Sequence, residues 1–86
     1  MRQISFSQDG FQEYYEWSKT NKSIHSKITD LIQEITRTPF KGKGKPEPLK
    51  GKYSGFWSRR INDEHRLIYK VDDSSVYIAK CRGHYS

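Results

Sequence analysis

The sequence predicts an α+β fold, in which an N-terminal strand and a two-helix hairpin pack on a mainly antiparallel β-sheet. Apolar residues recur at helical spacing between residues 7 and 38, and they alternate with polar residues, as in strands, from residue 55 onward. A segment rich in Gly, Pro and Lys separates the two regions. Because 86 residues supply one modest core, residues 1–86 are expected to form a single domain.

The first expected elements are a short strand and a helix. Ile4 and Phe6 alternate with polar neighbours, which is typical of a strand, and Ser7 is a suitable N-cap for the helix that follows. The side chains that share one face of this helix are Phe11, Tyr14, Tyr15 and Ser18. Helical spacing favours packing of the aromatic residues, Trp17 included, in the core over a base-stacking platform for nucleic acid.

A second amphipathic helix is expected between the short connection KTNKS and Pro39, which cannot continue a helix. Its apolar stripe, spaced four, three and four residues, consists of Ile24, Ile28, Leu31 and Ile35. Two helices joined so closely are predicted to form an antiparallel hairpin.

Residues 38–54 show no periodicity and consist mainly of Gly, Pro and Lys. Loops of this length in compact domains are usually functional or disordered. Three strands joined by polar turns are expected after this loop: GFWSRRI and HRLIYKV flank NDE, and SVYIAKC follows the turn DDSS. This β-meander completes the α+β prediction.

The net charge of +6 is concentrated in the second part of the chain. Residues 1–36 hold four basic and five acidic side chains, whereas residues 37–86 hold twelve basic and five acidic ones. Such a local excess of positive charge indicates a polyanionic partner, and nucleic acid is the leading candidate.

Cys81 is the one cysteine of the chain, so an intramolecular disulfide is excluded. The first residues lack the apolar run of a signal peptide, and no stretch reaches the roughly 18 apolar residues that a membrane helix needs. We therefore expect a soluble, cytoplasmic protein that does not associate with membranes.

Alternation along the predicted strands gathers basic side chains on one face of the sheet. The residues that share a face are Phe56, Ser58 and Arg60 in the first strand, Arg66, Ile68 and Lys70 in the second, and Ile78, Lys80 and Arg82 in the third. If Arg60 lies opposite Arg66, the two like charges destabilise the sheet until an anion binds. Lys80 is then expected beside Arg66.

Glu47 is the single acid among five lysines in the stretch KGKGKPEPLKGK. Taken alone, such a carboxylate is more often a counter-ion than a working group. Pro46 and Pro48 indicate a defined position, because each fixes its own φ and Pro48 also restricts Glu47. The residues alone leave both interpretations open.

Longer blocks of the sequence resemble a known family. The segment FKGKGKPEPLKGKYSGFWSRRINDEHRLIYK, the RTPF that leads into it and the terminal CRGHY are similar to the YoeB/Txe-type toxins of the RelE/ParE superfamily. The resemblance covers essentially the whole chain. It implies a RelE/ParE-like fold and a ribosome-dependent messenger-RNA endonuclease of a type II toxin–antitoxin pair, which a YefM-like antitoxin holds inactive.

The resemblance also implies roles for individual residues. By it, Glu47 is the general base, Arg66 stabilises the phosphate and His84 is the general acid. The residues expected to support RNA binding or the transition state are Lys50, Arg60 and Tyr85, together with Lys45, Arg59 and Arg82. The chain departs from the family pattern at Gly83, where a bulky residue is common, and at Ser86, which extends the chain.

The chemistry of RNA explains why these residue types are needed. RNA carries its own nucleophile, the 2′-hydroxyl, so a base, a stabilising cation and an acid suffice for cleavage. The expected products are a 2′,3′-cyclic phosphate and a 5′-hydroxyl. The acidic residues are scattered and no His/Cys spacing of a metal site occurs, so neither a metal nor another cofactor is expected.

Two other functions stay open at this point. Relatives on this fold poison DNA gyrase, and a basic domain can also act as a non-catalytic RNA-binding module. The combination of Glu47, Arg66 and His84 favours the nuclease. The partners that the resemblance implies are the antitoxin, the 70S ribosome with its messenger RNA, a second copy of the chain in a homodimer, and operator DNA for the toxin–antitoxin complex only.

Overall fold

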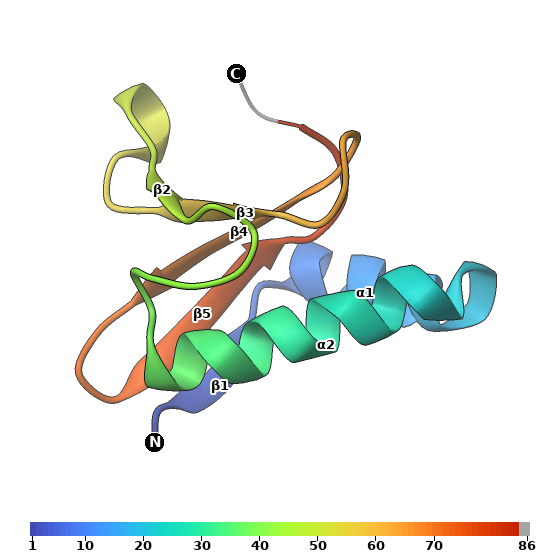
Figure 1. Cartoon of the computed structure of the whole chain (residues 1–86), viewed down its shortest axis with the longest axis horizontal. Coiled ribbons are helices and arrows are strands. Elements are labelled where there is room, and N and C mark those ends of the chain that lie inside the picture. Colours follow the sequence, from blue (N-terminus) through green and yellow to red (C-terminus); the bar gives the residue numbers. More distant parts are fainter. Residues whose placement is uncertain (85–86) are drawn as a thin grey trace.

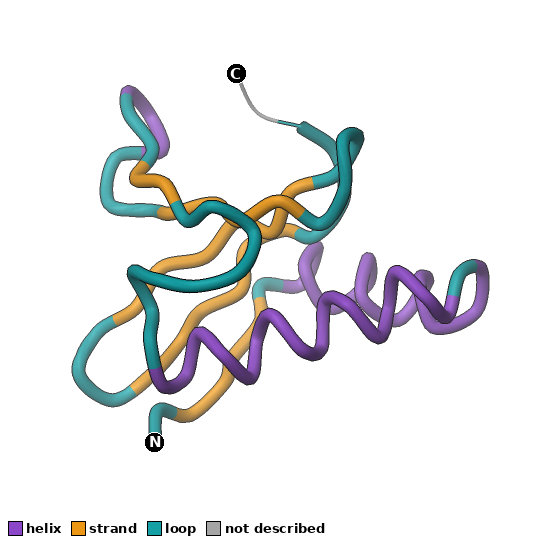
Figure 2. The backbone as a smooth tube through the Cα atoms, in the orientation of Figure 1, coloured by secondary structure: helices purple, strands orange, loops and turns teal. Residues whose placement is uncertain are grey.

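Two helices pack on one face of a five-stranded sheet (Figures 1 and 2) in this computed structural model, which describes residues 1–84. The elements are β1 (Gln3–Phe6), α1 (Gln8–Thr20), α2 (Lys22–Arg37), β2 (Glu47–Pro48), a 3-10 turn (Gly51–Tyr53), β3 (Trp57–Arg60), β4 (Arg66–Val71) and β5 (Ser75–Lys80). The strand order is β1-β5-β4-β3-β2, with β1 parallel to β5 and the other pairs antiparallel. The predicted α+β architecture is confirmed.

One residue, Asn21, ends α1 and begins α2, so the helices fold back on each other as predicted. The Ser7 hydroxyl caps α1 by accepting the Gly10 N–H at 2.9 Å, and the Asn21 side chain caps α2 by accepting the Ile24 N–H at 3.1 Å. The predicted stripe of α2 is confirmed, and its fully or almost fully buried members are Ile28, Leu31 and Ile35.

The face of α1 that meets the sheet differs from the predicted one. Gly10 and Trp17 are buried, whereas Phe11 and Tyr15 remain 57% and 50% exposed. The helix lies so close to β5 that a Cβ atom on Gly10 would lie 2.6 Å from the carbonyl oxygen of Ile78. The missing side chain at Gly10 therefore decides which face packs inward, and the spacing of the aromatic residues does not reveal it.

The core lies between the helices and the sheet. Its buried apolar side chains are Trp17, Ile28, Leu31, Ile32, Ile35, Ile61, Leu67, Tyr69, Val76, Ile78 and Cys81. Burial of a large apolar side chain contributes about 1.5–3 kcal/mol, so this cluster fixes the helices against β4 and β5. Within residues 1–84, neither helix has the length and apolar character that crossing a membrane requires.

The strand register confirms one predicted pairing and corrects another. Arg60 lies opposite Arg66, as expected. A bulge between β4 and β5 places Lys80 opposite Ile68 instead of beside Arg66. The same bulge puts Ile78 and Lys80 on opposite faces of the sheet, because an extra residue breaks the simple alternation used for the prediction.

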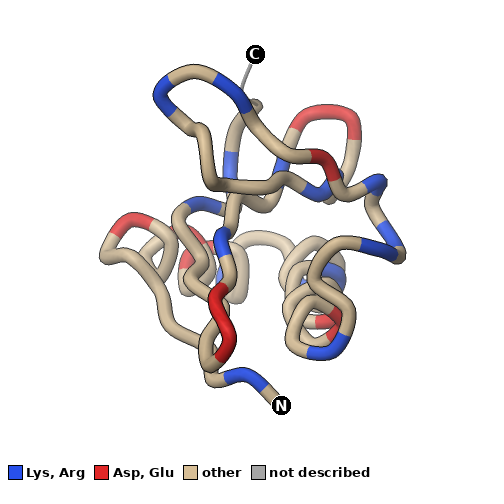
Figure 3. The backbone as a smooth tube through the Cα atoms, turned by 90° about the vertical axis from the view of Figure 1, so that its left-hand side faces the viewer, with Lys and Arg blue, Asp and Glu red and all other residues tan. Residues whose placement is uncertain are grey.

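The segment between α2 and β3 has a defined path along the edge of the sheet, although its sequence shows no pattern. Glu47 and Pro48 form the unpredicted strand β2 and pair with Ser58 and Trp57. Proline fits here because β2 is the last strand in the sheet order. Figure 3 shows basic residues along this segment. Glu47 is the one acidic residue of its sequence.

Candidate active site

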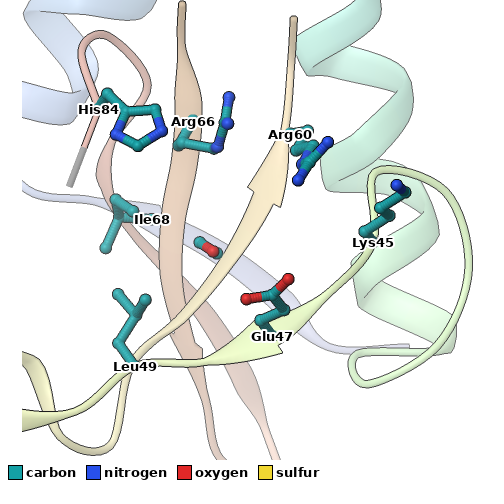
Figure 4. Close-up of a pocket in the computed structure, with 8 residues that line it drawn as sticks. Lys45, Glu47, Leu49, Arg60, Arg66, Ile68 and His84 are labelled. Atoms are coloured by element: carbon teal, nitrogen blue, oxygen red, sulfur yellow. The ribbon is translucent and has the colours of Figure 1, made fainter. Parts of the chain in front are cut away.

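A pocket of about 210 Å³ lies at the end of the sheet where β2, β3 and β4 meet (Figure 4). The residues that line it are Lys45, Glu47, Leu49, Ser58, Arg60, Arg66, Ile68 and His84. Arg66 and Ile68 alternate with the core residue Leu67, so the pocket is on the face of the sheet away from the helices.

The three predicted catalytic residues all line this pocket. Glu47 reaches it from edge strand β2, Arg66 from the first residue of β4, and His84 from the tail that follows β5, defined here as residues 81–84. Glu47 and His84 enter from opposite sides, and Arg66 lies next to His84 (Figure 4). Segments far apart in the sequence thus bring a carboxylate, a guanidinium and an imidazole to one cavity.

Arg66 is held by the turn that precedes β4. Its Nη1 donates to the carbonyl oxygens of Asn62 at 2.5 Å, His65 at 3.1 Å and Asp63 at 3.4 Å. Within residues 1–84 no other hydrogen bond engages this guanidinium group, so Nη2 and Nε keep donors for a ligand. Arg60 lies directly opposite, and an anion bound between the two cations relieves their repulsion.

Arg59 organises the basic loop, residues 38–46, from inside the protein. Its side chain is fully buried and donates to the carbonyl oxygens of Thr38 at 2.7 Å, Lys41 at 2.8 Å and Lys43 at 3.2 Å, and to the Glu34 carboxylate. The prediction that Arg59 contacts RNA is therefore wrong, because no part of its side chain reaches the surface.

Glu34 is the counter-ion of Arg59 and a second anchor of the basic loop. Its Oε1 accepts the Lys43 N–H at 2.8 Å as well as the Arg59 guanidinium. The backbone hydrogen bond from Lys43 and the contact with Arg59 hold the pKa of Glu34 below its usual value. On the other side of Arg59, the hydroxyl of Tyr69 accepts from Nε at 3.2 Å. Burial raises the pKa of Tyr69, so this hydroxyl stays protonated.

Gly44 brings the basic loop into backbone contact with β3. Its carbonyl oxygen accepts the Arg60 N–H at 2.6 Å, and a Cβ atom on Gly44 would lie 2.9 Å from the Arg60 carbonyl oxygen. The φ angle of +82° also favours glycine. This contact sets the point from which the chain continues through Lys45 to Glu47.

The tail is anchored to α1. The Cys81 N–H donates to Glu13 Oε1 at 2.8 Å, and the Cys81 carbonyl oxygen accepts from Trp17 Nε1 at 2.9 Å. Arg82 pairs with Glu16 at 3.1 Å and lies over the Trp17 ring, with its Cζ 4.8 Å from the centroid. Arg82 thus contacts α1 and does not line the pocket. Its expected part in supporting RNA binding stays a prediction.

Cys81 itself is a buried member of the core, as expected. Burial raises the pKa of its thiol to about 12. A thiol with such a pKa stays protonated at neutral pH and is a poor nucleophile.

The remaining predicted residues are placed as follows. Arg60 and Lys45 line the pocket together with the three predicted catalytic residues. Lys50 is exposed just beyond β2 and does not line it. Tyr85 lies outside the described residues. In residues 1–84 no three His, Cys, Asp or Glu side chains gather as metal ligands would.

Sequence reasoning gave no site role to three residues that line the pocket, namely Leu49, Ser58 and Ile68. Ser58 pairs directly opposite Glu47, and Ile68 lies one alternation from Arg66. Ser58 shares a strand face with Arg60, and Ile68 shares one with Arg66, so the sequence did indicate that both lie near the site. No signal pointed to Leu49, because its place depends on the unpredicted strand β2.

Comparison with known proteins gives the class of this protein. Residues 6–85 match the family model described as YoeB-like toxin of bacterial type II toxin–antitoxin system. Toxin YoeB of Escherichia coli strain K12 is 55% identical over 82 residues, which are 95% of this chain and 98% of that protein. The protein is therefore a toxin of a bacterial type II toxin–antitoxin system.

Solved structures agree with this class. The YoeB dimer from Staphylococcus aureus matches with a TM-score of 0.92 at 44% identity, covering 98% of both chains. The heterotetrameric YoeB–YefM toxin–antitoxin complex from the same organism contains a chain that matches with a TM-score of 0.90 at 43% identity, covering 99% of both chains. The chain belongs to the family of YoeB-like toxins.

Proposed function

We propose that this toxin is a ribosome-dependent endoribonuclease that cleaves messenger RNA in the ribosomal A site and so inhibits translation. The observation that carries the proposal is the pocket in which Glu47, Arg66 and His84 meet. It holds the base, the cation and the acid that are needed when the 2′-hydroxyl of RNA attacks its own phosphate.

In the proposed reaction, Glu47 removes the proton from the 2′-hydroxyl, and the freed oxygen attacks the neighbouring phosphorus. Arg66 and Arg60 stabilise the negative charge that develops on the phosphate oxygens. His84 donates a proton to the departing 5′-oxygen. The O2′–P bond forms and the P–O5′ bond breaks, which leaves a 2′,3′-cyclic phosphate and a 5′-hydroxyl.

The arrangement of the pocket supports this division of roles. The attacking and leaving oxygens of a phosphoryl transfer lie roughly in line, on opposite sides of the phosphorus. Glu47 and His84 likewise enter the pocket from opposite sides (Figure 4). Lys45 adds a further cation for the RNA backbone, and exposed Lys50 is proposed to contact RNA outside the pocket.

We also propose a YefM-like antitoxin as the neutralising partner, because the similar toxin of S. aureus forms its complex with YefM. An acidic segment that folds on binding would complement the cationic pocket. The other proposed partners are the 70S ribosome with messenger RNA, a second copy of the chain, and operator DNA bound by the toxin–antitoxin complex. These partners place the protein in the cytoplasm.

The test is cleavage of end-labelled messenger RNA by the wild type and by Glu47→Gln, with and without programmed ribosomes. We expect ribosome-dependent cuts within the A-site codon that end in a cyclic phosphate, and a loss of roughly 10²–10⁴-fold in rate for Glu47→Gln. Cleavage at the wild-type rate by Glu47→Gln would remove the proposed base. A folded wild type that never cuts RNA would direct the search to gyrase or to RNA binding alone.

A further inference from the structure

The backbone of Gly83, directly before His84, is held on both sides by two consecutive residues of the β3–β4 hairpin. The Gly83 N–H donates to Nδ1 of His65 at 2.9 Å. The Gly83 carbonyl oxygen accepts the Arg66 N–H at 2.9 Å. The tail that carries His84 is thus hydrogen-bonded to Arg66, which stabilises the phosphate in the proposed reaction, and to the adjacent His65.

His65 is itself fixed in position. Its ring is half-buried and lies edge-on to the Trp17 ring, with 5.0 Å between the centroids. Its backbone N–H donates to Asn62 Oδ1 at 2.8 Å, and its carbonyl oxygen accepts the Ile61 N–H at 3.0 Å. Trp17 also binds the Cys81 carbonyl oxygen, so α1, the β3–β4 turn and the tail meet at this histidine.

The hydrogen bond defines the protonation state of the imidazole. Nδ1 accepts a hydrogen bond only when it carries no proton, so the bond requires the His65 tautomer with its proton on Nε2. The backbone conformation at position 83 suits glycine. Gly83 has a φ angle of +89°, which turns the chain so that both of its backbone groups face the hairpin.

We propose that His65 is a positioning residue, whose neutral imidazole holds the Gly83 N–H and thereby sets the place of His84 in the pocket. This inference rests on the proposed role of His84 as general acid. It assigns no contact between His65 and RNA. A displacement of a catalytic group by about 1 Å can cost 10²-fold in rate, so loss of this anchor is expected to lower kcat and to change KM little.

Two matched variants separate the hydrogen bond from packing. His65→Asn keeps an acceptor oxygen at the place of Nδ1 but loses the ring, whereas His65→Leu fills space against Trp17 and has no acceptor. Ribosome-dependent cleavage gives kcat and KM, hydrogen exchange of the Gly83 amide reports the anchor without any substrate, and thermal unfolding checks the fold. We expect His65→Leu to speed Gly83 exchange and to lower kcat roughly 10–100-fold, and His65→Asn to retain most of both.

Several results would overturn the proposal. Wild-type kcat in His65→Leu would show that the anchor does not matter for the reaction, and equal losses in both variants would show that the ring only packs. A nitrogen NMR spectrum of the wild type with a protonated His65 Nδ1 at neutral pH would contradict the hydrogen bond itself. If the wild type does not cleave RNA, the proposed function fails, and unchanged Gly83 exchange in His65→Leu would then reject the anchor separately.

Discussion

Arg59 and Arg60 are neighbours in β3, but Arg59 is buried and Arg60 is exposed. Arg60 lines the pocket, whereas Arg59 is buried and bound to Glu34 and to the carbonyl oxygens of the basic loop. Burial of a charged group is costly unless the group has a counter-ion and its hydrogen bonds are satisfied. Basic character alone therefore does not identify a residue that contacts RNA. Strand alternation does distinguish the two arginines, because consecutive residues face opposite sides of a sheet.

Glu34→Gln is expected to lower the free energy of unfolding by about 1–3 kcal/mol at neutral pH, because it leaves the buried Arg59 without its counter-ion. The folded-state pKa of Glu34 is lowered, so its contribution is complete above the unfolded pKa and is lost as the pH falls through the folded value. Urea unfolding at pH 7 and at pH 3 measures the difference between wild type and variant, which should shrink at acid pH.

Glu16→Gln is the matched control for this experiment, because it removes the carboxylate of the exposed pair with Arg82. Exposed ion pairs contribute at most about 1 kcal/mol, so its effect should be small at both pH values. Equal destabilisation by Glu16→Gln and Glu34→Gln would contradict the role given to the buried pair.

Among the elements, the two helices and the strands β1, β3, β4 and β5 could be predicted from periodicity and caps, and the segment between α2 and β3 could not. Its path depends on backbone carbonyl oxygens that bind Arg59 and on the Gly44 contact with Arg60. Every residue has a carbonyl group, so such bonds leave no pattern in the sequence. The bulge between β4 and β5 escaped prediction for the same reason, and it places Lys80 opposite Ile68.

Gly44→Ala is expected to be more harmful than Gly51→Ala. Both glycines have a positive φ, so both variants carry backbone strain of about 1–2 kcal/mol. A Cβ atom at Gly44 would also press on the backbone of Arg60, whereas one at Gly51 would meet nothing within 4 Å. Thermal unfolding and ribosome-dependent cleavage should show the larger loss for Gly44→Ala. Equal losses would mean that the contact with β3 does not position Glu47.

In the molecule as a whole, residues 1–37 supply β1, α1 and α2, and residues 38–84 supply the pocket and most of the positive charge. The charge asymmetry predicted a polyanionic partner without locating its binding site. Glu47, Arg66 and His84 lie far apart in the sequence, so no local spacing could join them. In the sequence, only the family resemblance indicated that these three residues act together. In the structure, they line one pocket.

Lys45→Ala is expected to weaken binding to programmed ribosomes and to make it less sensitive to salt. A lost contact with one phosphate lowers the slope of log K against log salt by about 0.7 for a single strand. Lys27→Ala is the control, because this lysine is exposed on α2, on the other side of the sheet from the pocket. Binding titrations from low to high salt give both slopes. An unchanged slope for Lys45→Ala together with a reduced one for Lys27→Ala would place the RNA elsewhere.

In the proposed mechanism, Glu47 activates the 2′-hydroxyl of the substrate, which is the nucleophile. The most direct test replaces the ribose at the mapped cleavage site by 2′-deoxyribose in an otherwise unchanged messenger RNA on programmed ribosomes. The proposed mechanism predicts that cutting at that position stops while toxin binding to the ribosome persists. Continued cutting at the deoxyribose would show that another nucleophile attacks the phosphate, and it would contradict the mechanism.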